Sequence, residues 1–471
     1  MLLSLADFVE REYGTQVSDV DALKRTKVLV VTPDSLGRRM AGPAIRAWEM
    51  AKAIHTVAEV RLVSTVAADL TSDEFPVSHA DEETLRELVA WSDVLVFQGH
   101  TLSSYPWIKR AAKIIVADIY DPMHLEQLEQ TVGMPEERRL KAILETAEVL
   151  NDQIERADFM MCASDKQRDF WLGQLAAVYR INPLTYGDDA SLRRLLSVVP
   201  FGLQDAAPVQ RSHGIKGTVP GIAPTDKVIL WGGGIYNWFD PITLIEAVEK
   251  LSATRPDVRL FFLGAGHPNR NVPKMEMVTR ARDLAEERGL TDRFVFFHDD
   301  WVPYEERADF LLYADLGAST HFDHLETAFS FRTRILDYLW ATLPIVTTGG
   351  DTFAALVQEH GLGRVVPPTD ADALAEALES LLYDDAAHAE AQANIREFAE
   401  TMRWRTVLKP LLDFVVDPHP APDSPLTLET PRNRIVNDLR TRIEGIESST
   451  SWRMTKPIRS IKDAVLRSRR R

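Results

Sequence analysis

Short runs of β-branched and aromatic residues alternate with helical patterns from residue 27 to residue 383, and this alternation constrains the fold more than any other feature. Each apolar run has the length of one strand, and each pattern between two runs is long enough for a helix. Such an order predicts βαβ units and parallel sheets. The expected strands are 27–31, 60–64, 94–98, 114–118, 159–162 and 198–199, then 228–231, 259–263, 294–297, 316–318, 345–347 and 364–366.

The strands form two series, separated near residues 202–224 by glycine, proline and polar residues that follow no period. Two series predict an α/β protein with two doubly wound, Rossmann-like domains. We place the first domain at residues 1–205, the second at 206–400 and a closing helix at 401–418. Residues 419–471 are expected to form a linker and a tail, because the segment DPHPAPDSP cannot continue a helix.

The net charge of −16 is unevenly distributed. Residues 421–471 hold 12 basic and 6 acidic side chains, a net +6, so the first 420 residues carry −22. An acidic body argues against binding to nucleic acid, which requires basic surface. Cys162 has no second cysteine to pair with, and we expect it in the apolar core. No apolar run reaches the ~20 residues that span a bilayer, so we expect a cytoplasmic protein.

Two glycine-containing turns lead from a strand into a helix. Gly232–Gly234 follow the strand KVILW, and Gly42 precedes a helix that carries Arg46 in its first turns. Backbone N–H groups in such a turn can approach a phosphate, which makes Gly42, Gly233 and Gly234 candidate ligand-binding residues. The alternative explanations are an ordinary tight turn at the three glycines and an exposed arginine at position 46.

The densest group of polar residues lies between His321 and Asp351, in HFDHLETAFSFRTRILDYLWATLPIVTTGGD. It follows a buried strand, and the carboxyl ends of parallel strands are where open α/β sheets bind ligands. Arg334 and Asp337 are three residues apart, so they share one helical face. The pattern favours a ligand site, and the alternative is a solvated ion pair within the helix.

The sequence resembles the retaining glycosyltransferases of family four. The resemblance is carried by VVPFG at 198–202, the three glycines from 232, FFLGAG at 261–266 and RTRILDYLWATLPIV at 332–346. It covers residues 27–416 and implies the GT-B fold, in which two such domains face a cleft. It also implies a nucleotide-diphosphate sugar as donor, bound by the second domain, and an acceptor presented by the first.

The resemblance assigns roles around the donor sugar nucleotide. Family members bind the ribose hydroxyls with an acid seven residues before a Pro-Val pair, and Asp337 stands seven residues before Pro344. The family's glutamate, eight residues before that acid, falls on Phe329, so Glu326 is the nearest candidate to contact the donor sugar. Phe331 is also placed at the donor.

The family's arginine and lysine for the donor diphosphate are absent, because their positions read Gly234 and Phe239. Charge that develops on a leaving diphosphate needs positioned donors. We therefore predict that Arg332 and Arg334 replace the missing pair, with Arg46 in reserve. GT-B enzymes generally need no bound metal, so we expect none, including at the Asp299-Asp300 pair.

In the first domain, the strand IIVAD leads to Asp118, Asp121 and His124. Relatives often have a histidine after this strand, aimed at the transferred sugar. Asp118 and His124 are the candidates for that role, and Asp121 is the candidate to cap the turn before Pro122.

The last 20 residues, WRMTKPIRSIKDAVLRSRRR, hold eight basic side chains and one acid. On a helix they form a narrow apolar face beside cations, which suits an anionic membrane surface. The segment STSWRMTKPIR is similar to one appended to bacterial polysaccharide-assembly glycosyltransferases. The alternative is a disordered, solvated tail.

These observations predict a retaining glycosyltransferase that moves a sugar from a nucleotide-diphosphate sugar to a glycan or lipid-linked acceptor, in cell-surface polysaccharide synthesis at the cytoplasmic face of a membrane. We expect no cofactor beyond the donor substrate and no nucleic-acid partner. The alternatives are a degenerate, non-catalytic GT-B protein that serves as a membrane-associated assembly partner, and a GT-B sugar-nucleotide epimerase or phosphorylase.

Overall fold

The computed structural model describes residues 25–264, 275–300 and 302–424, with 438–439, 441–443, 445–446, 448–449 and 452. Residues 1–422 form one compact unit and residues 423–471 a second. In the second unit, residues 438–439, 441–443 and 445–446 are helical. None of the helices in the described part of the chain has the length and apolar character needed to cross a membrane.

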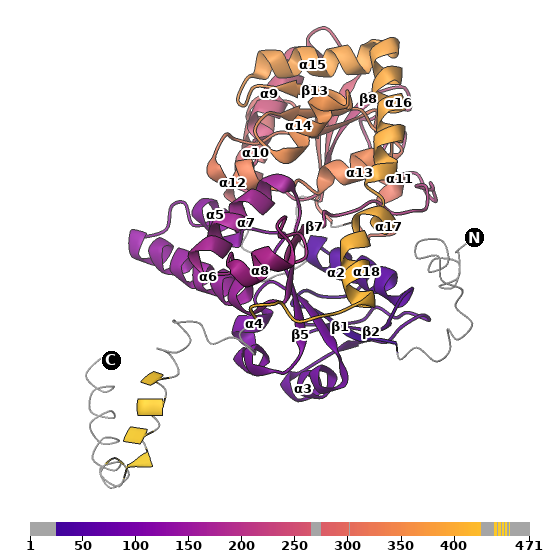
Figure 1. The fold of residues 1–471 in the computed structure, drawn as a ribbon. Coiled ribbons are helices and arrows are strands. Elements are labelled where there is room, and N and C mark those ends of the chain that lie inside the picture. The colour runs from indigo at the N-terminus through magenta and orange to yellow at the C-terminus, as the bar shows by residue number, and fades with distance from the viewer. Residues whose placement is uncertain are drawn as a thin grey trace. The chain divides into compact units, whose positions relative to one another are not determined.

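The first sheet contains seven parallel strands in the order β3-β2-β1-β4-β5-β6-β7 (Figure 1). The order reverses direction at β1, as in a doubly wound sheet. Its strands are β1 (Lys27–Thr32), β2 (Glu59–Ser64), β3 (Val77–His79), β4 (Val94–Gln98), β5 (Ile114–Asp118), β6 (Phe159–Cys162) and β7 (Leu196–Val198). Its helices are α2 (Gly42–His55), α3 (Glu82–Trp91), α4 (Thr101–Ser104), the 3-10 helix η2 (Pro106–Arg110), α5 (Met123–Gln130), α6 (Glu136–Arg156), α7 (Asp165–Ala177) and α8 (Pro183–Asp188).

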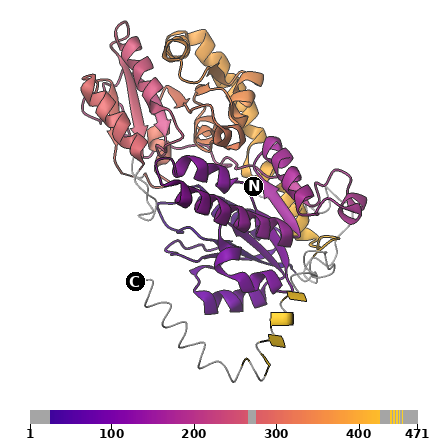
Figure 2. The same cartoon turned by 90° about the vertical axis from the view of Figure 1, so that its left-hand side faces the viewer.

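The second sheet contains six parallel strands in the order β10-β9-β8-β11-β12-β13, and Figure 2 shows it in a separate layered body above the first. Its strands are β8 (Lys227–Gly232), β9 (Val258–Leu263), β10 (Val295–His298), β11 (Leu316–Ser319), β12 (Ile345–Thr348) and β13 (Gly363–Val366). Its helices are α9 (Pro241–Ser252), α10 (Glu276–Glu287), α11 (Arg307–Leu311), α12 (Leu325–Phe329), α13 (Arg334–Trp340), α14 (Thr352–Glu359), α15 (Ala371–Tyr383) and α16 (Asp385–Thr401).

Both faces of each sheet are covered, as parallel sheets require. In β1, Val28 and Val30 pack into one core, whereas Leu29 and Val31 pack into another. This alternation follows from the two-residue period of a strand. It explains why the strands read as nearly continuous apolar runs and could be located from the sequence. With these two sheets, the chain has the predicted α/β architecture of two doubly wound domains.

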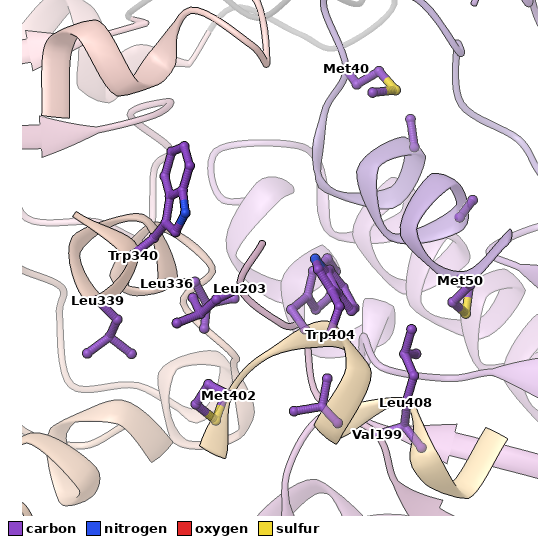
Figure 3. Close-up of a cluster of buried hydrophobic side chains, with 14 of the residues drawn as sticks. Met40, Met50, Val199, Leu203, Leu336, Leu339, Trp340, Met402, Trp404 and Leu408 are labelled. Carbon is purple, nitrogen blue, oxygen red and sulfur yellow. The ribbon is translucent and has the colours of Figure 1, made fainter. Parts of the chain in front are cut away.

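After the second sheet the chain returns to the first domain. Leu203 forms a bridge with Arg403, and the helices α17 (Trp404–Val407) and α18 (Lys409–Val416) pack against α2. Figure 3 shows Trp404 and Leu408 in the cluster that also holds Leu203, Met402 and Met50. The predicted single closing helix at 401–418 is therefore two short helices, because Pro410 stands in the first turn of α18 and cannot continue the helix before it.

The sequence patterns miss β3, whose three residues include one apolar side chain, and they place the last strand of the first sheet two residues late. The helices α4, α5, α8, α12 and α14 have eight residues or fewer, too few for a helical period to stand out in the sequence. The longer α16 has no clear apolar period because alanines make up much of its buried face.

Candidate active site

A cavity of about 580 Å³ lies between the two domains, at the carboxyl ends of both sheets. The first domain contributes residues that follow β1, β4 and β5, and the second contributes the turns after β8 and β9 together with α12 and α13. Eight predicted site residues line it: Gly42, Gly233, Gly234, Glu326, Phe331, Arg332, Arg334 and Asp337. Asp118, His124 and Arg46 do not.

The glycine turn after β8 is held in place by Tyr338, a fully buried residue of α13. The Tyr338 hydroxyl accepts a hydrogen bond from the Gly232 N–H at 2.8 Å and donates to the Ala318 carbonyl at 2.8 Å. Gly233 has φ +85°, in the left-handed region that favours glycine. A Cβ at Gly317 would overlap the Tyr338 ring, so that glycine makes room for the ring.

Arg334 lies across the same turn and is nearly buried. Its Nη2 donates to the Gly234 carbonyl at 2.8 Å, and its guanidinium carbon lies 4.1 Å from the ring centres of Trp231 and Phe239. Its Nη1 is buried and has no hydrogen-bond partner among the described residues. Burial lowers the pKa of Arg334 to about 10, so the side chain remains charged at neutral pH. The cavity wall therefore carries a cation with an unused donor.

Arg332 is committed to Glu326 instead. Its Nη1 and Nη2 donate to the two Glu326 carboxylate oxygens at 2.9 and 2.7 Å, and both side chains are buried. Its guanidinium also stacks over Phe239, at 4.8 Å. Arg332 and Glu326, both predicted site residues, thus form hydrogen bonds with each other in the bidentate geometry that suits arginine and a carboxylate.

Asp337 does not pair with Arg334, so the alternative of an ion pair within the helix is wrong. Its Oδ1 instead lies 2.7 Å from Nη1 of Arg307, the first residue of α11. Burial raises the pKa of Asp337, and the charge of Arg307 opposes that rise.

Besides Asp34, the first domain contributes the carboxylates of Asp121 and Glu126 to the cavity. Neither of these two carboxylates forms a hydrogen bond or ion pair within the described ranges, and no side chain caps the start of α5, so Asp121 does not cap the turn before Pro122. Burial and repulsion from Glu326 raise the pKa of Asp121 to about 7, against the pull of Arg332. Burial, Asp121 and Glu326 also raise the pKa of Glu126.

Arg46 and Asp118 form a closed pair away from the cavity. The Arg46 Nε and Nη2 donate to the Asp118 carboxylate at 2.7 and 2.8 Å, and both side chains are fully buried. Arg46 also donates to the carbonyls of Val199 and Pro200, and Gln98 donates to Asp118. An exposed arginine at position 46 is therefore wrong, and the structure does not bring either residue to the cavity as a ligand contact.

His124 is also directed away from the cavity. Its ring stacks on Phe170 with 5.5 Å between centres, and its buried Nδ1 has no partner among the described residues. Burial lowers the pKa of His124. The structure therefore does not bring His124 to the cavity lining, because the imidazole packs against Phe170 of α7.

The described residues contain no group of three or more histidines, cysteines or carboxylates that could hold a metal ion. Asp299 of the Asp299-Asp300 pair forms an ion pair with Arg282 on α10. Cys162 is buried in the core, and burial raises its pKa to about 12.

Sequence reasoning missed Arg307, Tyr338 and Glu126. Arg307 is 30 residues from Asp337 in the chain, so no local spacing connects them. Tyr338 lies among apolar residues of α13, where an aromatic side chain is expected in the core. A usable signal existed for Glu126 alone, since it follows a strand end that already carried two acids.

Comparisons with known proteins agree with this architecture. Residues 218–402 match the family model of glycosyl transferases group 1. A phosphatidyl-myo-inositol mannosyltransferase from Mycolicibacterium smegmatis is 29% identical over 164 residues, which cover 35% of this chain and 38% of that protein. The chain thus matches about two fifths of the length of that relative.

Solved structures share the fold at low sequence identity. A sucrose-phosphate synthase from Thermosynechococcus elongatus has TM-score 0.58 at 16% identity, covering 83% of this chain and 98% of that one. WaaG, a glycosyltransferase involved in lipopolysaccharide biosynthesis, has TM-score 0.57 at 17% identity, covering 83% and 100%. HepE from Anabaena, in complex with UDP and glucose, has TM-score 0.57 at 15% identity, covering 83% and 99%. Together, the solved structures show that the chain has the predicted GT-B fold, and the family match covers most of the second domain.

Proposed function

We propose that this protein transfers a sugar, with retention of anomeric configuration, from a nucleotide-diphosphate sugar to a hydroxyl of a glycan or lipid-linked acceptor. The observation that carries the proposal is the position of Arg334. Its guanidinium contacts both Gly234 and Phe239, the two positions that read arginine and lysine in the family that the sequence resembles. One cationic side chain from α13 thus lies against both of these positions.

Arg334 suits the donor diphosphate better than the other two predicted arginines. Among the described residues its Nη1 is unused, whereas both terminal nitrogens of Arg332 are held by Glu326 and Arg46 is enclosed with Asp118. Phosphate oxygens accept charge-assisted hydrogen bonds from guanidinium groups. The glycine turn beside it allows the phosphates to approach the backbone, since a Cβ added at Gly233 would meet no described atom within 4 Å.

Asp337 is the proposed partner of the ribose hydroxyls. One of its oxygens is held by Arg307, which leaves the other to accept from a ligand. The first-domain wall, with Asp121 and Glu126, is the proposed surface for acceptor hydroxyls, because unpaired carboxylates gain hydrogen bonds from hydroxyl donors.

The proposed mechanism is mainly positioning and charge stabilisation. Arg334 stabilises the negative charge that forms on the leaving diphosphate, and an oxygen of that diphosphate takes the proton of the attacking hydroxyl on the same face of the sugar. Enclosure between the two walls holds the hydroxyl near the reacting carbon and limits the access of water. Retention itself rests on the resemblance to family four.

The experiment is a thermal-stability screen with UDP-, GDP- and dTDP-sugars, since a bound ligand raises stability by RT ln(1 + [L]/Kd). We expect one group of donors to raise Tm for the native protein and to do so far less for Arg334→Gln. Arg255→Gln is the matched control, because the Arg255 guanidinium also stacks on an aromatic ring, that of Tyr383, but lies outside the cavity lining. If no nucleotide sugar shifts Tm, the proposal fails. The anomeric configuration of the product, read by NMR, tests retention.

We also propose that the basic tail holds the enzyme at the cytoplasmic face of an anionic membrane, where a polysaccharide acceptor is assembled. Apart from Trp452, the tail lies outside the described residues, so the proposal rests on the net +7 of residues 452–471 against −22 on the first 420. Removing the residues after Ser451 should abolish sedimentation with anionic vesicles while activity on a soluble acceptor persists. Equal vesicle binding by the truncated protein would contradict this attachment.

A further inference from the structure

Arg307 is a cavity residue to which the proposed function gives no role of its own. It is the first residue of α11, and its side chain is 19% exposed. The guanidinium carbon lies 4.1 Å from the ring centre of Tyr304 and 5.1 Å from that of Trp340, so two aromatic rings fix its position. Stacking of this kind restricts a side chain that would otherwise sample many rotamers.

The orientation of Arg307 brings its charge to one acid. Its Nη1 lies 2.7 Å from Oδ1 of Asp337, and this is its one ion pair within the described residues. Its Nε is buried without a hydrogen-bond partner there. The guanidinium is therefore held mainly by the rings and by Asp337, and Asp337 is held mainly by the guanidinium.

The two rings are themselves tied to the first domain and to the segment that joins the domains. The Tyr304 N–H donates to the Arg38 carbonyl at 3.1 Å, and its hydroxyl donates to Glu49 of α2 at 3.4 Å. The Trp340 indole N–H donates to the Ala206 carbonyl at 2.8 Å. The position of Arg307 thus depends on contacts outside the second domain.

We propose that Arg307 is a positioning residue that keeps the Asp337 carboxylate charged and oriented for the donor. We also propose that the two rings that hold Arg307, Tyr304 and Trp340, couple the position of this acid to the packing of the two domains against each other. The inference rests on the proposed function, because that function assigns Asp337 to the donor.

The other groups that face Asp337 are Tyr304 and Tyr338, and Glu49 faces Tyr304. Burial raises the pKa of both tyrosines, so neither ionises in the pH range of the test.

The test measures donor Kd by calorimetry between pH 5.5 and pH 8.5, with the sugar nucleotide that stabilises the native protein. Arg307→Gln should weaken binding roughly tenfold, the loss of one charge-assisted interaction, and should make Kd rise as pH falls. The sign follows because the pKa of Asp337, already raised by burial, rises further when the opposing cation is removed. Arg307→Lys should keep the flat pH profile and lose only part of the affinity.

Arg259→Gln is the matched control for general destabilisation. Arg259 pairs with Asp226 at 3.0 Å and stacks on Phe294 at 5.4 Å, in the same domain but outside the cavity lining. It should lower Tm without changing donor Kd or its pH profile.

Two results separate the inference from the proposed function. If Asp337→Asn weakens donor binding but Arg307→Gln leaves both Kd and its pH profile unchanged, the positioning role is overturned and the proposed function stands. If the native protein binds no sugar nucleotide, both are overturned. A Lys variant as weak and as pH-dependent as the Gln variant would also contradict the charge-holding role.

Discussion

The two walls of the cavity differ in charge. The wall from the second domain carries three arginines, Arg307, Arg332 and Arg334, of which only Arg334 lacks an acidic partner among the described residues, since Asp337 and Glu326 pair with the other two. Within the described lining, the wall from the first domain carries Asp34, Asp121, Glu126 and amides, and has no lysine, arginine or histidine. Such a cavity favours an anionic group beside Arg334 and hydroxyl groups along the first-domain wall. Under the proposed function, this difference divides the recognition of donor diphosphate and acceptor between the domains.

The largest effect is expected at Arg334, on the second-domain wall. Arg334→Gln should lower kcat by ~10²–10³, the cost of losing one positioned donor to charge that forms in the transition state. Steady-state assays with a saturating donor measure it. Glu126→Gln, on the opposite wall, should instead raise the acceptor KM. If both variants change the same constant, the division between the walls is wrong.

The next effect concerns the ribose end of the same wall. Asp337→Asn should weaken donor binding by about tenfold or more, because hydrogen bonds to a charged group contribute ~1.5–3 kcal/mol. Calorimetric titration of the donor gives the constant, and an unchanged melting curve shows that folding is intact. Unaltered affinity in a folded variant would remove Asp337 from the donor site.

The next prediction concerns the first-domain wall, where Asp121 should make the stability of the protein depend on pH. The folded-state pKa of Asp121 is about 7, above its ordinary value of 3.8. Between these two values the folded protein keeps a proton on Asp121 that the unfolded chain has lost. This contribution to stability is complete below the ordinary pKa and is lost as pH rises towards and through 7. Asp121→Asn cannot ionise, so its Tm should exceed that of the native protein at pH 8, and the gain should shrink by pH 5.

The control for this effect is Asp169→Asn, on the exposed surface of α7. It should show no pH-dependent difference in Tm. A Tm gain for Asp121→Asn that is equal at pH 5 and pH 8 would show that a proton is not its cause.

The smallest effect compares the glycine turns of the two walls. Gly233→Ala should destabilise the protein by ~1 kcal/mol, because φ is +85° there. Gly42→Ala should be tolerated, since Gly42 begins α2 and a Cβ would meet only Phe201, at 3.8 Å, among the described residues. Denaturant unfolding measures both. Equal costs would mean that the turn after β8 is not specially shaped.

Sequence alone located every strand but β3 and placed Arg334 among the residues that line the cavity, and it did so for physical reasons. Buried parallel strands are apolar on both faces, so runs such as KVILW stand out, and Arg334 lies in a stretch where polar residues gather after such a strand. The remaining contacts depend on tertiary packing. Arg46 and Asp118 are 72 residues apart, and Arg307 and Asp337 are 30 apart, so no local spacing marks either pair. Consequently, sequence spacing could not distinguish the enclosed pair Arg46–Asp118 from the pair Arg307–Asp337, which lines the cavity.

The return of α17 and α18 to the first domain has a consequence for how the protein is made. Phe414 of α18 stacks on Phe159 of β6 with 4.7 Å between ring centres, and Trp404 and Leu408 complete the core around α2. The first domain to leave the ribosome therefore lacks part of its own interior until more than 400 residues have been translated. The second domain has its last helix, α16, by Thr401, so the first domain, although it is translated earlier, is the last to complete its core.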